Sequence, residues 1–232
     1  MNALVVKSGP TGRKFEFNHK NKDDFQMKMD LGRSLVNICS TVPSGVVVFF
    51  TSYKQEKMFF DLFSKNKILE QIEAKKTVFR EPKKTSEVGN LLTQFQMAVR
   101  NRGAILFAVV GGKVSEGINF SNELCRAVIM VGLPYPDIKS LEIELKMNWL
   151  NKKRSGAGQM LYQGLCMRAV NQCVGRAIRH RKRWKSSIAS NANFSRRRRF
   201  SYRFFLRKKV VIIKFMSKNF IDKLYFCVFQ SF

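Results

Sequence analysis

The chain has 232 residues, of which 45% are hydrophobic, so it is long and apolar enough to fill a core of ordinary size. Its five cysteines are scattered with no pair at metal-ligand spacing, which argues against a cysteine-built metal centre and fits a reducing, intracellular setting. Lysine and arginine outnumber aspartate and glutamate by 43 to 16, and the net charge of +27 is consistent either with a surface that follows nucleic-acid phosphates or with a solvated basic face.

Hydrophobic periodicity predicts strands and helices that alternate along the chain without internal repeats. Short continuous apolar runs are typical of strands buried on both faces, and apolar residues spaced three and four apart are typical of amphipathic helices. This alternation predicts a parallel, doubly wound α/β sheet. We expect strands at 4–6, 15–17, 46–51, 77–79, 104–110 and 126–131, and helices at 23–40, 54–65, from 86 to about 99, at 138–151 and at 160–181.

A glycine-rich segment follows the apolar run at 104–110. Residues 111–120 read Gly-Gly-Lys-Val-Ser-Glu-Gly-Ile-Asn-Phe. A glycine-rich turn at the carboxyl end of a parallel strand is where doubly wound folds bind ligands, because glycine lets backbone N–H groups approach an anion. Ser115 and Glu116 add polar contacts there. The segment is not a Walker A loop, because Gly112-Lys113 is followed by valine rather than by serine or threonine.

A second informative segment, residues 172–180, reads Gln-Cys-Val-Gly-Arg-Ala-Ile-Arg-His. In a helix, Gln172, Arg176 and Arg179 would share one face, opposite the apolar Val170, Val174, Ala177 and Ile178. An amide that orients a water and two guanidiniums that neutralise developing charge suit a bound triphosphate. An amphipathic basic helix with a solvated charged face would show the same pattern.

In combination, these segments resemble the motifs of a known family, the superfamily-two DNA helicases that contain an iron–sulfur cluster and include the XPD-type, FANCJ-type and Chl-type enzymes. Order and spacing agree from about Leu4 to His180. The Gly-Gly-Lys start and Asn119 are most similar to the Chl-type subgroup, which is involved in replication and sister-chromatid cohesion. The segments that carry the resemblance are motif IV at 48–53, motif V at 112–120, the strand exit Gly-Leu-Pro-Tyr-Pro at 132–136 and motif VI at 172–179.

The resemblance implies the RecA-like fold of a second helicase lobe and a role for individual residues. Gln172 would lie near the γ-phosphate and the attacking water, and Arg176 and Arg179 would be arginine fingers that reach a nucleotide held by another domain. Ser52 and Tyr53 would lie near the DNA backbone, although Tyr53 could equally be a strand-end aromatic that covers the core. The residues expected to bind nucleotide or to couple its site to the DNA groove are Gly112, Lys113, Ser115, Glu116, Gly117 and Gly175.

The resemblance also implies what this chain would need from elsewhere. ATP and Mg²⁺ would be shared with a first RecA-like lobe, because the sequence has neither a Walker A loop nor an Asp-Glu-Ala-His-type motif. The iron–sulfur cluster of the full-length family would have its ligands in that missing lobe, and we expect no metal ligands in this chain. The chain alone would therefore be catalytically silent. The expected partners are single-stranded or forked DNA and the first lobe, and no membrane association is expected. The expected location is the nucleus. The apolar run at 1–7 is too short for a signal peptide.

The resemblance implies 5′ to 3′ translocation on DNA, driven by ATP hydrolysis as two lobes close and reopen. A competing hypothesis is a basic nucleic-acid-binding protein without enzymatic activity. A third is the unfolded product of a truncated gene, which predicts no cooperative unfolding.

The expected domain boundary follows residue 181. Residues 1–181 would form the lobe, and residues 182–232 an irregular basic and aromatic tail in which fifteen lysines and arginines, counted from Arg181, accompany one acid. The tail could bind nucleic acid through arginines and stacking rings. Membrane insertion is disfavoured because lysines interrupt every long apolar stretch. The abrupt end of family-like character favours a tail that is not family-derived, translated from a truncated or frame-shifted gene.

Overall fold

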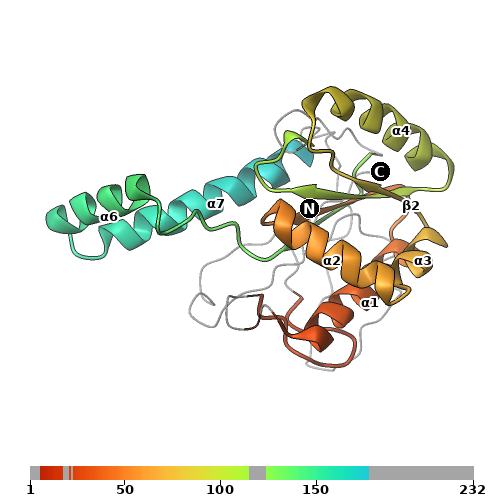
Figure 1. The fold of residues 1–232 in the computed structure, drawn as a ribbon, viewed down its shortest axis with the longest axis horizontal. Helices are drawn as coiled ribbons and strands as arrows, with labels where there is room; N and C mark the ends of the chain where they lie inside the picture. Colours follow the sequence, from red (N-terminus) through yellow and green to blue (C-terminus); the bar gives the residue numbers. More distant parts are fainter. Residues whose placement is uncertain (1–5, 18–20, 22, 115–123, 178–232) are drawn as a thin grey trace, which may run out of the picture.

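The structure of the protein is a computed structural model that describes residues 6–17, 21, 23–114 and 124–177. The described chain alternates helices with parallel strands, as the sequence predicts (Figure 1). The expected boundary after residue 181 lies outside the described residues. The elements are α1 (Phe25–Thr41), β1 (Gly45–Phe50), α2 (Tyr53–Lys65), α3 (Ile68–Glu73), β2 (Thr77–Arg80), η1 (Thr85–Glu87), α4 (Val88–Asn101), β3 (Ala104–Val109), β4 (Ala127–Val131), α6 (Leu141–Lys153) and α7 (Ala157–Ala177).

The four strands form one sheet in the order β2-β3-β1-β4, and every pairing is parallel. In the centre, Gly45 of β1 is paired with Ala104 of β3, and Phe50 is paired with Val109. All residues of β1, β3 and β4 are buried. Such strands need cover on both faces, which explains why their sequences are continuous apolar runs rather than alternating ones. The predicted fold class, a doubly wound parallel α/β sheet, is confirmed.

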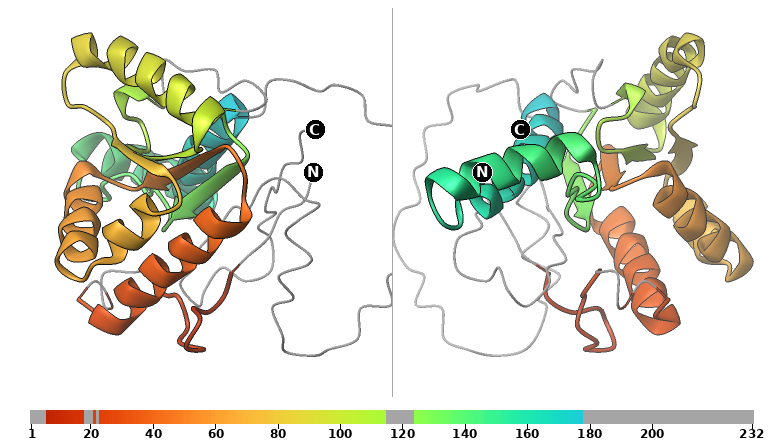
Figure 2. Two further views of the ribbon diagram at one scale, coloured as in Figure 1. Left: turned by 90° about the vertical axis from the view of Figure 1, so that its right-hand side faces the viewer. Right: turned by 60° about the vertical axis from the view of Figure 1, so that its left-hand side comes forward.

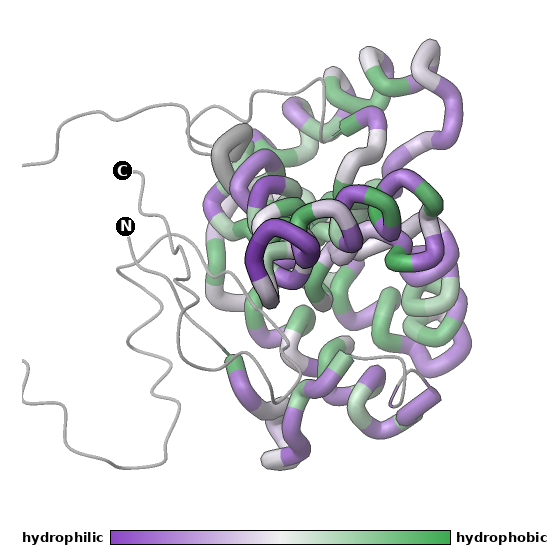
Figure 3. Tube along the Cα trace, turned by 90° about the vertical axis from the view of Figure 1, so that its left-hand side faces the viewer, coloured by the Kyte–Doolittle hydropathy of each residue, from purple (hydrophilic) through white to green (hydrophobic). Residues whose placement is uncertain are grey.

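Helices cover the two faces of the sheet and create two separate cores (Figures 1 and 2). Helices α1, α2 and α3 pack on one face, where Phe50, Phe59 and Phe107 belong to the larger core. Helix α4 covers the other face through Phe95 and Val99, which join the smaller core. Alternate residues of each strand enter opposite cores. Along the helices, hydrophilic and hydrophobic residues alternate, as expected for helices with one face on a core (Figure 3).

Local signals in the sequence set the ends of these helices. Asp24 caps α1 by accepting the Met27 N–H at 3.0 Å. Burial alone would raise the pKa of Asp24, but the hydrogen bonds from Met27 and Arg13 outweigh it and lower that pKa. Gly103 ends α4 in the left-handed conformation with φ +88°, and its N–H bonds to the Ala98 carbonyl at 2.9 Å.

Three details of the expected elements are wrong or incomplete. Residues 15–17 form no strand; the segment before α1 is instead a tight turn closed by a single antiparallel bridge between Ser8 and Lys14. Phe15 is buried in the larger core, so its apolar character reflects packing and not strand pairing. Of the strand expected at 4–6, only residue 6 is described, and it is not in a strand. The sequence analysis also missed α3, a helix of six residues between α2 and β2 that buries Ile68, Leu69 and Ile72.

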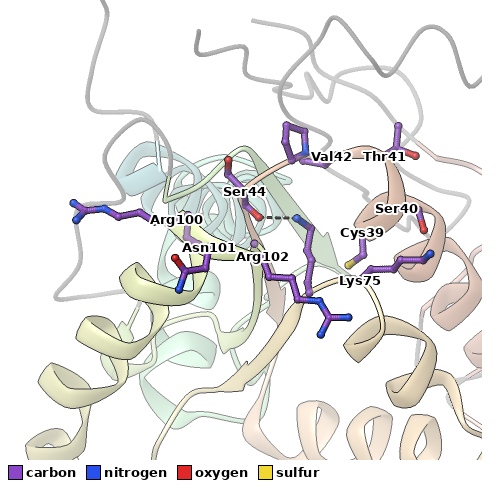
Figure 4. Close-up of a pocket in the computed structure, with 13 residues that line it drawn as sticks. Cys39, Ser40, Thr41, Val42, Ser44, Lys75, Arg100, Asn101 and Arg102 are labelled. Atoms are coloured by element: carbon purple, nitrogen blue, oxygen red, sulfur yellow. Dashed lines mark hydrogen bonds between the residues drawn. The ribbon is translucent and has the colours of Figure 1, made fainter.

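At the amino-terminal edge of the sheet, where α1, α3 and α4 end, a pocket of about 420 Å³ is lined in part by basic side chains (Figure 4). Lys76 is buried and donates to the Ser44 carbonyl at 2.7 Å, and Arg102 donates to the Ala74 carbonyl at 2.6 Å. Burial lowers the pKa of Lys76 and raises the pKa of the neighbouring Cys39 to about 12. Arg102 thus complements a carbonyl group at the carboxyl end of α3, and Lys76 bonds to the carbonyl that directly precedes β1.

The first residue of β1 must be glycine, which gives a direct test of the fold. A Cβ on Gly45 would lie 1.9 Å from the Leu124 carbonyl oxygen, whereas a Cβ on Gly89 in α4 would meet nothing within 4 Å. We expect Gly45→Ala to lower the free energy of unfolding by about 3 kcal/mol or more through overpacking. Gly89→Ala should raise it by about 0.4–1 kcal/mol, because the unfolded chain loses freedom. Urea denaturation of both variants measures this difference, and equal effects would contradict the parallel packing of β1 against the segment before β4.

Candidate functional site

The loops that leave the four strands meet at the carboxyl-terminal edge of the sheet, because all four strands run in the same direction. Ser52 and Tyr53 follow β1, Glu81 follows β2, residues 110–114 follow β3, and Gly132 follows β4. This edge is where open parallel sheets bind ligands. The residues predicted from motif IV and from the described start of motif V therefore lie on the same side of the molecule, although they are about sixty positions apart in the sequence.

Ser52 forms the amino-terminal cap of α2 at this edge. Its hydroxyl accepts the Gln55 N–H at 3.2 Å, and the Gln55 amide oxygen in turn accepts the Thr51 N–H at 2.8 Å and the Thr51 hydroxyl at 2.9 Å. This reciprocal arrangement closely follows a capping box. Ser52 remains exposed. The first turn of α2, which carries the positive end of the helix dipole, is thus presented to solvent beside the glycine-rich loop.

The glycine-rich loop turns sharply directly after β3. Gly111 has φ +70°, a conformation that side chains with a Cβ rarely adopt. Gly112 is buried, and a Cβ at this position would lie 2.3 Å from Glu81 Oε1. Lys113 is exposed, whereas the next residue, Val114, is completely buried in the smaller core. Both glycines are therefore required by local geometry, one by its backbone conformation and the other by the close approach of a carboxylate.

That carboxylate, Glu81, is the residue of this edge that the sequence analysis missed. Its Oε2 accepts the Val109 N–H at 2.7 Å, and its Oε1 accepts the Val114 N–H at 3.0 Å and the Tyr53 hydroxyl at 3.0 Å. Glu81 is only 9% exposed. A charged residue directly after a short strand and before proline, at the ligand-binding edge of a parallel sheet, was the available signal.

Tyr53 thus contacts the interior through its hydroxyl, while Ser52 beside it faces solvent. Both interpretations offered for Tyr53, a DNA contact and a strand-end aromatic, are compatible with its intermediate exposure. Its hydroxyl, however, already has a buried acceptor, so a direct bond from that hydroxyl to phosphate would compete with the bond to Glu81.

The helix predicted to carry the arginine fingers runs toward this region. Gln172 is exposed on α7, and its neighbour Cys173 is 1% exposed and belongs to the same hydrophobic core as Val114. Gly175 and Arg176 lie in the last described residues of α7, where the structure gives the backbone only. Ser115, Glu116, Gly117 and Arg179, also predicted site residues, lie outside the described residues.

The segment after β4 is tied to α7 by two tyrosines. Tyr135 stacks on Tyr162 with ring centroids 5.1 Å apart, and the Tyr162 hydroxyl donates to the Pro136 carbonyl at 2.9 Å. Burial raises the pKa of both phenols, so both remain protonated at neutral pH. From this anchor, α6 and α7 form a hairpin that extends away from the sheet, with a hydrophilic tip at residues 152–155 (Figures 1 and 3).

Within the described ranges, we find no group of three or more histidine, cysteine, aspartate or glutamate side chains placed to hold a metal ion. Cys39, Cys125, Cys166 and Cys173 are all buried. Burial raises the pKa of the Cys125 thiol, which keeps it protonated. None of the described helices is both long enough and apolar enough to span a bilayer.

Comparison with known proteins gives consistent matches. Residues 35–199 match the family model described as a helicase C-terminal domain. The chain is 42% identical over 206 residues to the ATP-dependent DNA helicase DDX11 of Danio rerio, covering 83% of this chain and 23% of that protein. It is 46% identical over 178 residues to the ATP-dependent DNA helicase CHL1 of Candida albicans, covering 72% of this chain and 21% of that protein. Its fold is similar to the structure of S. tokodaii Xpd4, with a TM-score of 0.52, 16% identity and coverage of 87% and 32%. The chain thus spans about a quarter of the length of these curated relatives.

The fit between Gly112 and Glu81 can be tested by adding one methyl group. We expect Gly112→Ala to displace the Glu81 carboxylate and to lower the free energy of unfolding by about 1–3 kcal/mol, because buried N–H groups lose their acceptor. Gly164→Ala, on an open face of α7, should leave stability unchanged or slightly higher. Chemical denaturation checks both variants. Unchanged stability in Gly112→Ala would show that the loop does not pack against Glu81.

Proposed function

Because the chain belongs to the family of helicase C-terminal domains, we propose that it is the second RecA-like lobe of an ATP-dependent DNA helicase of the DDX11 and CHL1 type. The resemblance to XPD-type and Chl-type helicases predicted from the sequence motifs is confirmed. The observation that carries the proposal is the convergence of the motif IV helix start and the glycine-rich loop at the carboxyl edge of one parallel sheet.

The proposed activity needs a first lobe. ATP and Mg²⁺ would be held mainly by the Walker A and acidic motifs of that lobe, which this sequence does not contain. Closure of the two lobes would bring Arg176 and Arg179 to the γ-phosphate, where their guanidiniums neutralise charge that develops on the transferred phosphoryl group. Gln172 would orient the attacking water. Hydrolysis would then reopen the lobes.

We propose that the DNA backbone follows the exposed start of α2. Ser52 is exposed there, and the positive end of a helix dipole favours a phosphate. The net charge of +27 adds long-range attraction to a polyanion. Single-stranded or forked DNA is the proposed substrate, with the nucleus as the proposed location. An iron–sulfur cluster does not fit the described part of this chain, where no group of three or more possible ligands is placed to hold a metal.

The arginine-finger role can be tested in a two-lobed protein. In the Danio rerio helicase, the segment that aligns with this chain is replaced by the aligned part of this chain, and DNA-stimulated ATP hydrolysis is measured. We expect Arg176→Ala to lower kcat by about 1,000-fold, as for other arginine fingers. The matched control is Arg168→Ala, an exposed arginine two turns earlier on α7, which should stay within about twofold of the parent.

The outcomes of this experiment separate the competing hypotheses. A basic nucleic-acid binder without a motor role gives a chimera that binds DNA but hydrolyses no ATP, whichever arginine is present. Equal losses in Arg176→Ala and Arg168→Ala would indicate a general effect of charge rather than a finger.

The DNA contact at Ser52 can be separated from its role as a helix cap. Asparagine and aspartate both cap helices as well as serine does, but aspartate adds a negative charge. We expect Ser52→Asn and Ser52→Asp to keep the melting temperature within a few degrees. Ser52→Asp should weaken binding of a fluorescent oligo-dT by about tenfold, whereas Ser52→Asn should change it by less than about twofold, as expected for a phosphate neighbour. Equal affinities, measured by anisotropy at fixed salt, would place the DNA elsewhere.

A further inference from the structure

We propose that Glu81 is the positioning residue that links the DNA-facing start of α2 to the glycine-rich loop at residues 110–114. This inference rests on the proposed function, because it assigns a structural link between the two surfaces that a motor lobe must coordinate. Glu81 is buried and contacts both regions from the inside, on the side away from solvent. It acts through the three hydrogen bonds that its buried carboxylate accepts.

The three donors come from three different parts of the chain. The Tyr53 hydroxyl belongs to the first residue of α2, the Val109 N–H to the last residue of β3, and the Val114 N–H to the far side of the glycine-rich turn. A single side chain therefore fixes the helix and both ends of the loop. An ionised carboxylate suits this position, because it offers four acceptor sites and no donor. A glutamine would direct an N–H₂ group at one of the donors.

The backbone of Glu81 and its neighbour Arg80 are held in place by hydrogen bonds, so a displacement of Tyr53 would also move the Glu81 carboxylate. Its own N–H bonds to the Phe107 carbonyl at 2.8 Å, which extends the β2–β3 ladder to this residue. The preceding Arg80 is held by a bidentate pair to Glu56, with both N–O distances 2.8 Å, and its guanidinium lies 3.9 Å from the centre of the Phe60 ring. Both partners of Arg80 belong to α2. The carboxylate is therefore carried by a rigid joint between β2, β3 and α2.

The loop side of the link is equally tight. The space between Gly112 and the carboxylate leaves no room for a Cβ, so the loop cannot slide past Glu81 without breaking its hydrogen bonds. Val114 anchors the loop in the smaller core, and Lys113 between them stays exposed. When a phosphate docks at the start of α2 and shifts Tyr53, the change reaches the Val109 and Val114 amides through one carboxylate.

Hydrogen exchange on the full 232-residue chain, with and without oligo-dT, tests this link. In the parent chain, DNA should slow exchange at the start of α2 and also at residues 109–114. Tyr53→Phe keeps the ring and removes only the hydroxyl. In this variant DNA should still protect α2, while protection at 109–114 should fall from about tenfold to less than about twofold, the loss expected for one hydrogen bond. The matched control is Tyr162→Phe, which removes the hydroxyl that bonds to Pro136 and should keep both effects.

Each outcome either supports or overturns the link. Protection of α2 without protection of 109–114 in the parent chain overturns it, as does full loop protection in Tyr53→Phe. A merely structural role would speed exchange of the free variant everywhere and leave the DNA-dependent difference unchanged, which also overturns it. If the parent chain shows no protection at either segment, DNA binding itself fails, and the proposed function falls together with the link. Glu81→Gln provides a second variant, expected to lose the loop protection in the same way.

Discussion

The parallel pairing of β1 with β3 and β4 is the constraint on which the rest of this structure depends. β1 is central, and its residues pair in register with β3 from Gly45 to Phe50 and with β4 from Val46 to Phe50. Parallel strands need long crossovers, so helices must cover both faces of the sheet and every central strand becomes fully buried. The same pairing sends every strand exit to one edge, and it is this edge that collects the candidate functional residues.

The two edges of the sheet use charge in different ways. At the amino-terminal edge, Lys76 bonds to the Ser44 carbonyl just before β1 and Arg102 bonds to the Ala74 carbonyl at the end of α3, so part of the basic character of the chain is structural. At the carboxyl-terminal edge, the Glu81 carboxylate is buried, and it accepts hydrogen bonds from two backbone N–H groups and a phenol. The net positive charge therefore does not report directly on a binding surface, and only exposed cations at the functional edge can contact a ligand.

Hydrogen bonds to buried polar groups fix the backbone conformation at the carboxyl-terminal edge of the sheet. An N–H group in a tight loop after a strand has no ladder partner, and leaving it unsatisfied in the interior costs free energy. Glu81 supplies the acceptor for the Val114 N–H in the loop, for the Val109 N–H at the end of β3 and for the Tyr53 hydroxyl, and Gly112 leaves room for it. The described start of the segment that resembles motif V, residues 112–114, is thereby fixed against Glu81, which also bonds to the first residue of α2. Through the Tyr53–Glu81 hydrogen bond, the contacts that stabilise the loop also connect it to the start of α2, the proposed DNA-binding surface.

The sequence by itself determined the fold class and most of the elements, since buried strands such as 46–51 and 104–110 have a composition that few other structures tolerate. It also identified the glycine-rich loop, because that loop depends on residues close together in the chain. It misassigned 15–17, where apolar residues pack into the core without pairing, and it missed α3, whose six residues are too short for a clear period. The role of Glu81 was decided only by the tertiary structure. Its donors lie 28 and 33 positions away in the sequence, and only the parallel sheet brings them within hydrogen-bonding distance of one carboxylate.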